Sequence, residues 1–143
     1  MLSNLHHLGV LMNNLLAVIL MSSVSFISFA SGAEPTAPLN TPELKQVVGK
    51  DKKNTIIFFQ NPLGRPCIEQ KAILDKLHAE KKSSFNIAHV STMKPEDRQA
   101  FYDYGVRSLP MLVLVNKNGK ISRVFSPGIQ SASTIAGALS GAE

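Results

Sequence analysis

The sequence is poor in the residues that most redox and metal sites use, because it has one cysteine, Cys67, among 143 residues. A single cysteine excludes a disulfide within the chain, a two-cysteine redox motif and a zinc site built from several cysteines. Tryptophan is absent and aromatic residues make up 6% of the chain, which argues against a stacking surface for nucleic acid. His78 and His89 lack a second histidine or a carboxylate at ligand spacing, so we expect both to be structural. We therefore expect no metal site, no cofactor and no nucleic-acid partner.

Charged residues are missing from the first 33 positions, so the net charge of +5 lies entirely in the rest of the chain. Leu15–Ala30 is a largely apolar run of about 16 residues, near the length of a secretory signal and short of the ~20 residues that span a bilayer. Small residues precede two cleavage points, after Ala33 and after Ala30, and we prefer the cut after Ala33. We expect residues 1–33 to be a signal peptide and the protein to be exported, to the periplasm or another extracytoplasmic compartment. If residues 8–30 form one longer apolar stretch, they would instead remain as an uncleaved membrane anchor.

One folded domain is predicted to begin at residue 41, after a short linker. Residues 34–40 contain two prolines and few apolar side chains, a composition typical of an extended linker. Thr41 and Pro42 have the chemistry of a helix start, with a hydroxyl for the N-cap and a proline in the first turn. We therefore place a single domain at 41–143, which is close to the commonest domain size.

Hydrophobic periodicity predicts alternating helices and strands within this domain. Strands are expected near residues 55–60, 85–91, 111–116 and 120–126, and helices near 41–49, 67–82, 95–104 and 133–139. The first strand lacks polar alternation, which is typical of a central strand buried on both faces. Asn118 and Gly119 predict a hairpin turn between the last two strands. The order predicts an α/β fold, a central mixed sheet with helices on both faces and a C-terminal antiparallel hairpin.

Three segments of the chain resemble, in order, segments of the thioredoxin family. Phe59–Cys67 is similar to the family's Phe-Trp-Ala-Pro-Trp-Cys-Gly-Pro-Cys, Tyr104–Pro110 to the segment that leads to its cis-proline, and Val115–Lys120 to its hairpin. The resemblance covers roughly residues 41–139 and implies a thioredoxin-like fold. It also implies a cis bond between Leu109 and Pro110, which places a backbone edge beside the redox motif for an extended substrate peptide.

The departures from the family pattern fall on the residues that carry its chemistry. Gly64 occupies the place of the attacking cysteine, Leu63 replaces the preceding tryptophan, and Phe58 stands where thioredoxins commonly keep a buried aspartate. Pro66 and Cys67 are what survives of the motif. The resolving thiol is therefore present without its attacker, and ordinary dithiol exchange cannot proceed on this chain alone.

The resemblance makes Cys67 the candidate redox thiol and implies a binding surface beside it. The substrate-binding residues that it implies are Gly64, Arg65, Pro66, Leu109 and Pro110. If Cys67 is a reactive thiol, the missing side chain at Gly64 makes it more accessible; the alternative is that Cys67 is packed in the core.

Two functions remain open at this point. In the first, an exported thioredoxin-like protein acts in thiol-disulfide homeostasis through its single thiol, as a monothiol disulfide oxidoreductase whose partners are protein thiols, protein disulfides or glutathione. In the second, a non-catalytic thioredoxin-fold module binds an extended peptide or a protein partner, and Cys67 is a packed small hydrophobic residue. In either case we expect a monomer, with membrane contact only if the N-terminal segment stays uncleaved.

Overall fold

The computed structural model describes residues 32–142. Its elements follow the chain in the order α2 (Pro42–Val47), η1 (Lys50–Lys52), β1 (Thr55–Gln60), α3 (Arg65–Glu80), β2 (Asn86–Ser91), η2 (Pro95–Asp97), α4 (Arg98–Asp103), β3 (Met111–Val115), β4 (Ile121–Val124) and α5 (Ala132–Gly141). The predicted signal peptide, and its alternative as an anchor over 8–30, lie outside the described residues except for Gly32 and Ala33. Within the described range, no helix has the length and apolar character needed to cross a membrane.

The four strands form one mixed sheet in the order β2-β1-β3-β4. β1 pairs with β2 in parallel and with β3 in the antiparallel direction, and β3 and β4 form the C-terminal hairpin. Phe58 lies level with His89 on β2 and with Leu112 on β3. Every residue of β1 and β3 is buried, as expected for strands that are covered on both faces.

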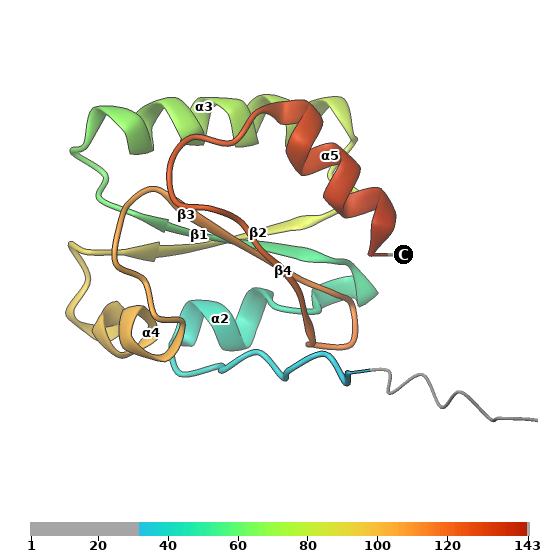
Figure 1. Cartoon of the computed structure of the whole chain (residues 1–143), viewed down its shortest axis with the longest axis horizontal. Helices are drawn as coiled ribbons and strands as arrows, with labels where there is room; N and C mark the ends of the chain where they lie inside the picture. Colours follow the sequence, from blue (N-terminus) through green and yellow to red (C-terminus); the bar gives the residue numbers. More distant parts are fainter. Residues whose placement is uncertain (1–31, 143) are drawn as a thin grey trace, which may run out of the picture. The chain divides into compact units, whose positions relative to one another are not determined.

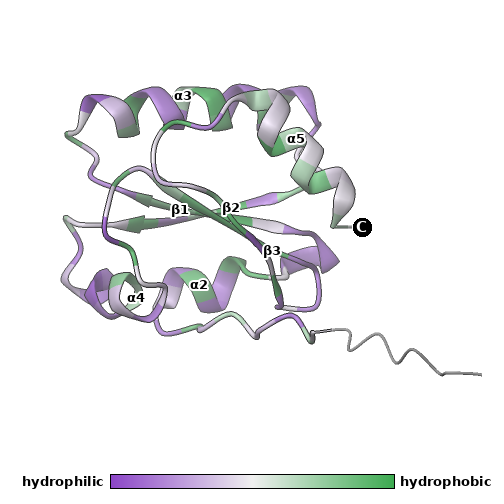
Figure 2. Ribbon diagram, in the orientation of Figure 1, coloured by the Kyte–Doolittle hydropathy of each residue, from purple (hydrophilic) through white to green (hydrophobic). Residues whose placement is uncertain are grey.

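Helices cover both faces of this sheet (Figure 1). α3 and α5 lie over one face, where Leu74 and Ile135 belong to the same core cluster as Phe58, and α2 and α4 cover the other, where Leu44 packs with Phe59. Neighbouring residues of β1 serve opposite cores because successive side chains of a strand point to opposite faces. The inner strands are hydrophobic, whereas the outer side of α3 carries mostly hydrophilic residues (Figure 2). The predicted α/β architecture is confirmed.

The structure moves some predicted boundaries by a few residues. α3 begins at Arg65, earlier than expected, because Gly64 is its N-cap and the Ile68 N–H donates to the Gly64 carbonyl at 3.0 Å. Pro66 fits the first turn, where a missing N–H costs nothing. The helix expected over 95–104 is divided into the 3-10 turn η2 and the α-helix α4.

Residues 34–40 are extended, as expected, but they pack along the domain instead of forming a free linker. Thr36 forms an isolated antiparallel bridge with Lys120. The Tyr104 hydroxyl donates to the Pro38 carbonyl at 2.7 Å, and burial raises the pKa of that hydroxyl. Prolines are compatible with an edge segment because some of its N–H groups face away from the sheet. The proline content of residues 34–40 therefore fits both a free linker and a packed edge segment, and could not distinguish between them.

Candidate functional site

The connection from β1 to α3 is a tight turn from Asn61 to Gly64. The Gly64 N–H donates to the Asn61 carbonyl at 3.0 Å, and the Leu63 N–H donates to Asn61 Oδ1 at 3.1 Å. Asparagine in the first position and proline in the second are typical of such a turn. The turn leaves Leu63 75% exposed and places Arg65 and Pro66 on the surface at the start of α3.

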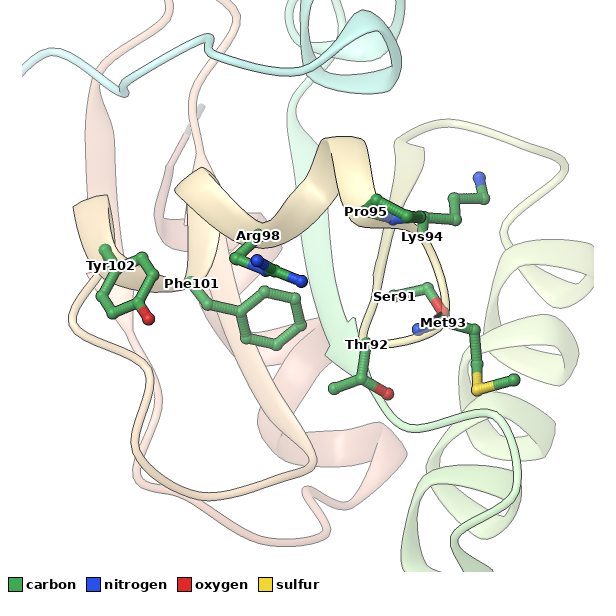
Figure 3. Close-up of a pocket in the computed structure, with 8 residues that line it drawn as sticks. All are labelled: Ser91, Thr92, Met93, Lys94, Pro95, Arg98, Phe101 and Tyr102. Carbon is green, nitrogen blue, oxygen red and sulfur yellow. Dashed lines mark hydrogen bonds between the residues drawn. The ribbon is translucent and has the colours of Figure 1, made fainter.

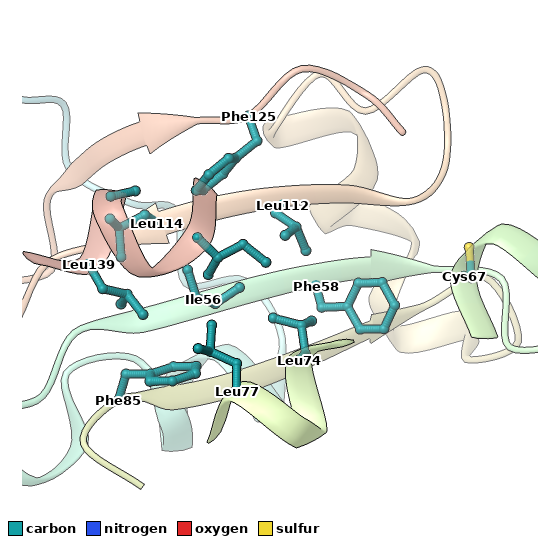
Figure 4. Packing of buried hydrophobic residues seen from close by; sticks show 12 residues of the cluster. Ile56, Phe58, Cys67, Leu74, Leu77, Phe85, Leu112, Leu114, Phe125 and Leu139 are labelled. Atoms are coloured by element: carbon teal, nitrogen blue, oxygen red, sulfur yellow. The ribbon is translucent and has the colours of Figure 1, made fainter. Parts of the chain in front are cut away.

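Cys67 is the third residue of α3, and it belongs to the core and not to the surface (Figure 4). Its exposed fraction is 2%, and it lies in the hydrophobic cluster that contains Phe58 and Leu74. Its sulfur accepts a hydrogen bond from the Asn61 N–H at 3.4 Å. Of the two interpretations of Cys67, the accessible thiol is therefore wrong and the packed residue is supported, because the core and the backbone of the turn cover the sulfur without a side chain at position 64.

The loop before β3 holds the other half of the predicted site. The Leu109–Pro110 peptide bond is cis. Pro110 is buried, and its carbonyl accepts a hydrogen bond from the Gly128 N–H at 2.9 Å. Leu109 is half-buried and packs against the cluster that contains Cys67. Among residues 32–142 the N–H and the carbonyl of Leu109 have no hydrogen-bond partner, so this backbone edge is unpaired next to the core that holds the thiol.

A buried amide that the sequence analysis did not single out connects these two parts. Gln70 lies one turn after Cys67 and is fully buried. It makes two hydrogen bonds to the backbone of Gln130, in the loop that also carries Gly128. Because Gly128 in turn bonds to Pro110, this loop joins α3 to the cis-proline segment. The sequence does carry a sign of this role, because Gln70 is a polar residue on the otherwise apolar, buried side of α3.

His78 and His89, the two histidines among residues 32–142, make contacts within the fold. His78 Nε2 donates to the Phe85 carbonyl at 2.9 Å, and Gln60 Nε2 lies 3.2 Å from His89 Nδ1. Burial lowers the pKa of His89, and the nearby Glu43 carboxylate opposes that effect. In the part of the chain that the structure describes, no three His, Cys, Asp or Glu side chains are grouped to hold a metal ion.

A surface cleft of about 260 Å³ lies between the turn after β2 and α4 (Figure 3). The residues that line it and carry its chemistry are Thr92, Met93, Lys94, Arg98, Phe101 and Tyr102. The Thr92 N–H donates at 3.0 Å to the carbonyl of Gln60, the last residue of β1. The cleft therefore flanks the strand end from which the Asn61 turn begins.

The strand order, a helix that starts at Gly64 directly after β1, and a cis-proline before the hairpin occur together in this chain. The chain has a thioredoxin-like fold. The solution structure of an uncharacterised thioredoxin-like protein from Clostridium perfringens superposes with a TM-score of 0.61 at 20% identity, over 85% of this chain and 90% of that one.

Two malarial proteins share the thioredoxin-like fold. Thioredoxin-2, described as a component of the parasite's protein secretion machinery, has a TM-score of 0.56 at 17% identity, over 62% of this chain and 82% of its own. A second malarial protein has a TM-score of 0.55 at 17% identity, over 63% of this chain and 97% of its own. No protein-family model and no curated protein matches the sequence. These likenesses establish a fold and not an activity, because one fold hosts many functions.

Proposed function

We propose that this thioredoxin-fold protein binds an extended segment of a partner along Leu109, with Cys67 as a packed core residue. The observation that supports this function is the contrast between a thiol that is 2% exposed and a neighbouring backbone edge without a partner among residues 32–142. A buried cysteine behaves as a small hydrophobic residue, whereas an unpaired backbone edge is a template for another strand. The site is therefore better suited to holding a chain than to thiol chemistry.

Exposed side chains near the start of α3 supply further contacts for such a segment. Leu63 is 75% exposed and Ile68 is 54% exposed. Arg65, Ile68 and Glu69 line a shallow cleft on α3. Burying the apolar side chains of Leu63 and Ile68 against a partner would be favourable. We therefore expect the bound segment to contribute apolar side chains on the side that faces α3.

A second candidate function is thiol-disulfide exchange through Cys67 alone, with protein thiols, protein disulfides or glutathione as partners. The contact that favours it is the hydrogen bond from the Asn61 N–H to Cys67 Sγ at a helix start, a setting in which reactive cysteines occur. A single thiol can form a mixed disulfide but cannot resolve it, so the second thiol has to come from a partner or a small molecule. This function also requires the turn that covers Cys67 to open.

We further propose that the protein is exported, on the basis of the apolar run at Leu15–Ala30 and the small residues before Ala33. A cut after Ala33 keeps the contacts that the domain makes from residue 34 onward, including the hydrogen bond from Asn116 Nδ2 to Glu34 Oε2 at 2.8 Å. The intact mass of the protein recovered from cells tests this proposal. A chain that begins at Glu34 supports cleavage, and a full-length chain in the membrane fraction supports the anchor at 8–30.

Binding of an unfolded chain without free thiols tests the proposed function. Carboxymethylated α-lactalbumin is a suitable probe because all its thiols are blocked. We expect wild type and Cys67→Ser to bind it equally. Leu109→Pro removes the N–H of the edge and should bind about fivefold more weakly than Leu109→Ala, which keeps the backbone groups.

The outcomes separate the two candidate functions. Binding that requires Cys67, or that occurs only with unblocked thiols on the probe, would support thiol-disulfide exchange. Equal binding by the proline and alanine variants at Leu109 would overturn the proposed edge. If the proline variant does not fold, the amide signal of Leu109 in wild type decides the matter, because it must shift when the probe binds.

A further inference from the structure

The cleft between α4 and the turn after β2 has no part in the function proposed above. One wall of the cleft is a face of α4, where Arg98, Phe101 and Tyr102 stand at spacings of three and four residues and therefore on the same side of the helix. The opposite wall is the turn that carries Thr92 and Met93. In Figure 3 the Arg98 guanidinium lies beside the Phe101 ring, with Thr92 across the cleft from them.

Hydrogen bonds hold the turn in place. The Ser91 N–H donates to Asp97 Oδ2 at 2.8 Å, and the Met93 N–H donates to Ser91 Oγ at 3.1 Å. The Thr92 N–H donates to the Gln60 carbonyl at 3.0 Å. Because these backbone donors are satisfied within the fold, the cleft is formed before any ligand arrives. Binding therefore carries no entropic cost for ordering the turn.

The charge of the cleft favours an anion. Lys94 and Arg98 line it, and neither takes part in an ion pair within residues 32–142. No carboxylate lines it, and the nearby Asp97 is buried and bound to the Ser91 N–H. The guanidinium of Arg98 presents a planar set of N–H donors that matches a carboxylate. The Lys94 side chain points away from Arg98 in Figure 3, so its positive charge lies at the rim of the cleft.

The aromatic residues give the cleft an apolar wall. Phe101 packs edge-on against Phe59, with ring centroids 5.4 Å apart, so the position of its ring is fixed. Tyr102 and Met93 are 74% and 62% exposed and extend the apolar surface. A volume of about 260 Å³ lies below the 300–1,000 Å³ range of pockets for drug-sized ligands and suits a group the size of one amino-acid residue.

We propose that this cleft binds the C-terminal residue of a peptide, with the carboxylate on Arg98 and an apolar side chain against Phe101 and Tyr102. The cleft is open to solvent, so the chain that precedes the terminal residue can leave it. The proposal does not depend on the function proposed above, because no residue of the cleft belongs to the Gly64–Cys67 segment or to the Leu109 edge.

Nuclear magnetic resonance titration of the isotope-labelled protein with N-acetyl-phenylalanine tests this proposal. The probe carries a free carboxylate like that of a peptide C-terminus, and the amide signals of Thr92 and Phe101 should shift. N-acetyl-phenylalaninamide, which lacks the charge, should bind about tenfold more weakly. Arg98→Gln should weaken binding of the acid by a similar factor and leave binding of the amide unchanged. Arg123→Gln removes the same charge at an exposed position on β4 and should leave both unchanged.

Three outcomes would overturn the proposal. Equal binding of the acid and the amide would remove the role of the carboxylate, and normal binding by Arg98→Gln would remove the role of the guanidinium. Phenylacetate or inorganic phosphate binding as tightly as N-acetyl-phenylalanine would assign the cleft to small anions in general. Cys67→Ser, and Leu109→Pro if it folds, should leave binding of the acid unchanged, so this test does not depend on the function proposed above.

Discussion

Gln70 on α3 and Gln130 in the loop before α5 are joined by two hydrogen bonds across 60 positions of sequence. The Gln130 N–H donates to Gln70 Oε1 at 2.6 Å, and Gln70 Nε2 donates to the Gln130 carbonyl at 3.2 Å. The side chain of Gln130 donates in turn to the Ser126 carbonyl at 2.7 Å. Because Gln70 is fully buried, its amide takes the place of water for both backbone groups and fixes the loop that contacts Pro110.

Replacing this buried amide should destabilise the protein. Gln70→Ala leaves the backbone N–H and carbonyl of Gln130 without their partners, and we expect the free energy of unfolding to fall by about 1–3 kcal/mol. Urea unfolding measures the change. Gln46→Ala, at an exposed position on α2, is the matched control and should change stability by less than about 0.5 kcal/mol.

The same variant reports on the cis-proline segment. The Gly128 N–H donates to the Pro110 carbonyl, so Gln70→Ala should speed hydrogen exchange at the Gly128 amide more than at amides of the central strands. Unchanged exchange at Gly128 together with unchanged stability would contradict the role given to Gln70.

Most of the fold could be predicted from the sequence because its signals are local. Residues 55–60 lack polar alternation and form a strand buried on both faces, and Thr41 Oγ1 caps α2 by accepting the Leu44 N–H at 3.1 Å. The 3-10 turn η1 could not be predicted, because Asp51 and Lys52 inside it adopt positive φ values of 55° and 54°, although neither residue is a glycine. The packing of residues 34–40 depends on partners far along the chain.

The candidate site could be predicted in part. The resemblance placed the Leu109–Pro110 edge beside the motif that contains Cys67, and in the structure Leu109 packs against the cluster of Cys67. The sequence left two interpretations of the thiol open, accessible or packed, and the structure shows the packed one. Solvent access to Cys67 depends on how the backbone of the turn packs against its sulfur, and the spacing of residues in the sequence does not determine that packing. The sequence marks Gln70 as a polar residue on an apolar helix side. Nothing in the sequence around Gln130 shows that the backbone of Gln130 binds α3. The cleft of Arg98 is lined by residues of one short stretch, 91–102, and its shape depends on how the 3-10 turn η2 bends the chain between the turn after β2 and α4.

His89 should make the stability of the protein depend on pH. Burial lowers its pKa in the folded protein from the ordinary 6.5, so the unfolded chain binds more protons as the pH falls through that range. Stability contributed by neutral His89 is therefore complete at about pH 7.5 and is lost progressively toward the lowered pKa. Urea unfolding at about pH 7.5 and about pH 5 measures the loss, and His89→Asn should show a smaller one.

The interpretation of this profile depends on the groups around the ring. Desolvation is the main cause of the lowered pKa, with Lys71 and Lys94 acting in the same direction and Glu43 and Asp75 against it. A wild-type profile that matches that of His89→Asn would show that the ring titrates alike in the folded and unfolded chains.

Restoring a cysteine at position 64 should create disulfide reductase activity. Gly64 has an ordinary φ of −80°, and the nearest heavy atom to an added Cβ is the Asn61 carbonyl oxygen at 3.4 Å, so a side chain fits. In Gly64→Cys the introduced thiol can attack a disulfide and Cys67 can resolve the mixed disulfide. Insulin reduction in the presence of dithiothreitol should exceed the background rate, whereas wild type should not.

Two control variants isolate the role of the thiol pair. Gly64→Ser adds a side chain of similar size without a thiol. Gly64→Cys combined with Cys67→Ser supplies a thiol that can attack a disulfide but no second thiol to resolve the mixed disulfide. Both should stay at the background rate. Wild-type activity equal to that of an ordinary dithiol thioredoxin would contradict the view that Gly64 removes dithiol exchange.

Cys67 should resist modification while the protein is folded. The thiol is 2% exposed and accepts the Asn61 N–H, so a reagent reaches it only when the start of α3 or the whole domain opens. Intact-mass spectrometry after treatment with iodoacetamide or glutathione disulfide should show an unmodified chain, and the same treatment in urea should give an adduct. Gly64→Ala should be protected equally, because the side chain at position 64 does not decide access. Native modification at the unfolded rate, or a disulfide-linked dimer that Cys67→Ser abolishes, would show that the turn opens readily and would favour thiol-disulfide exchange.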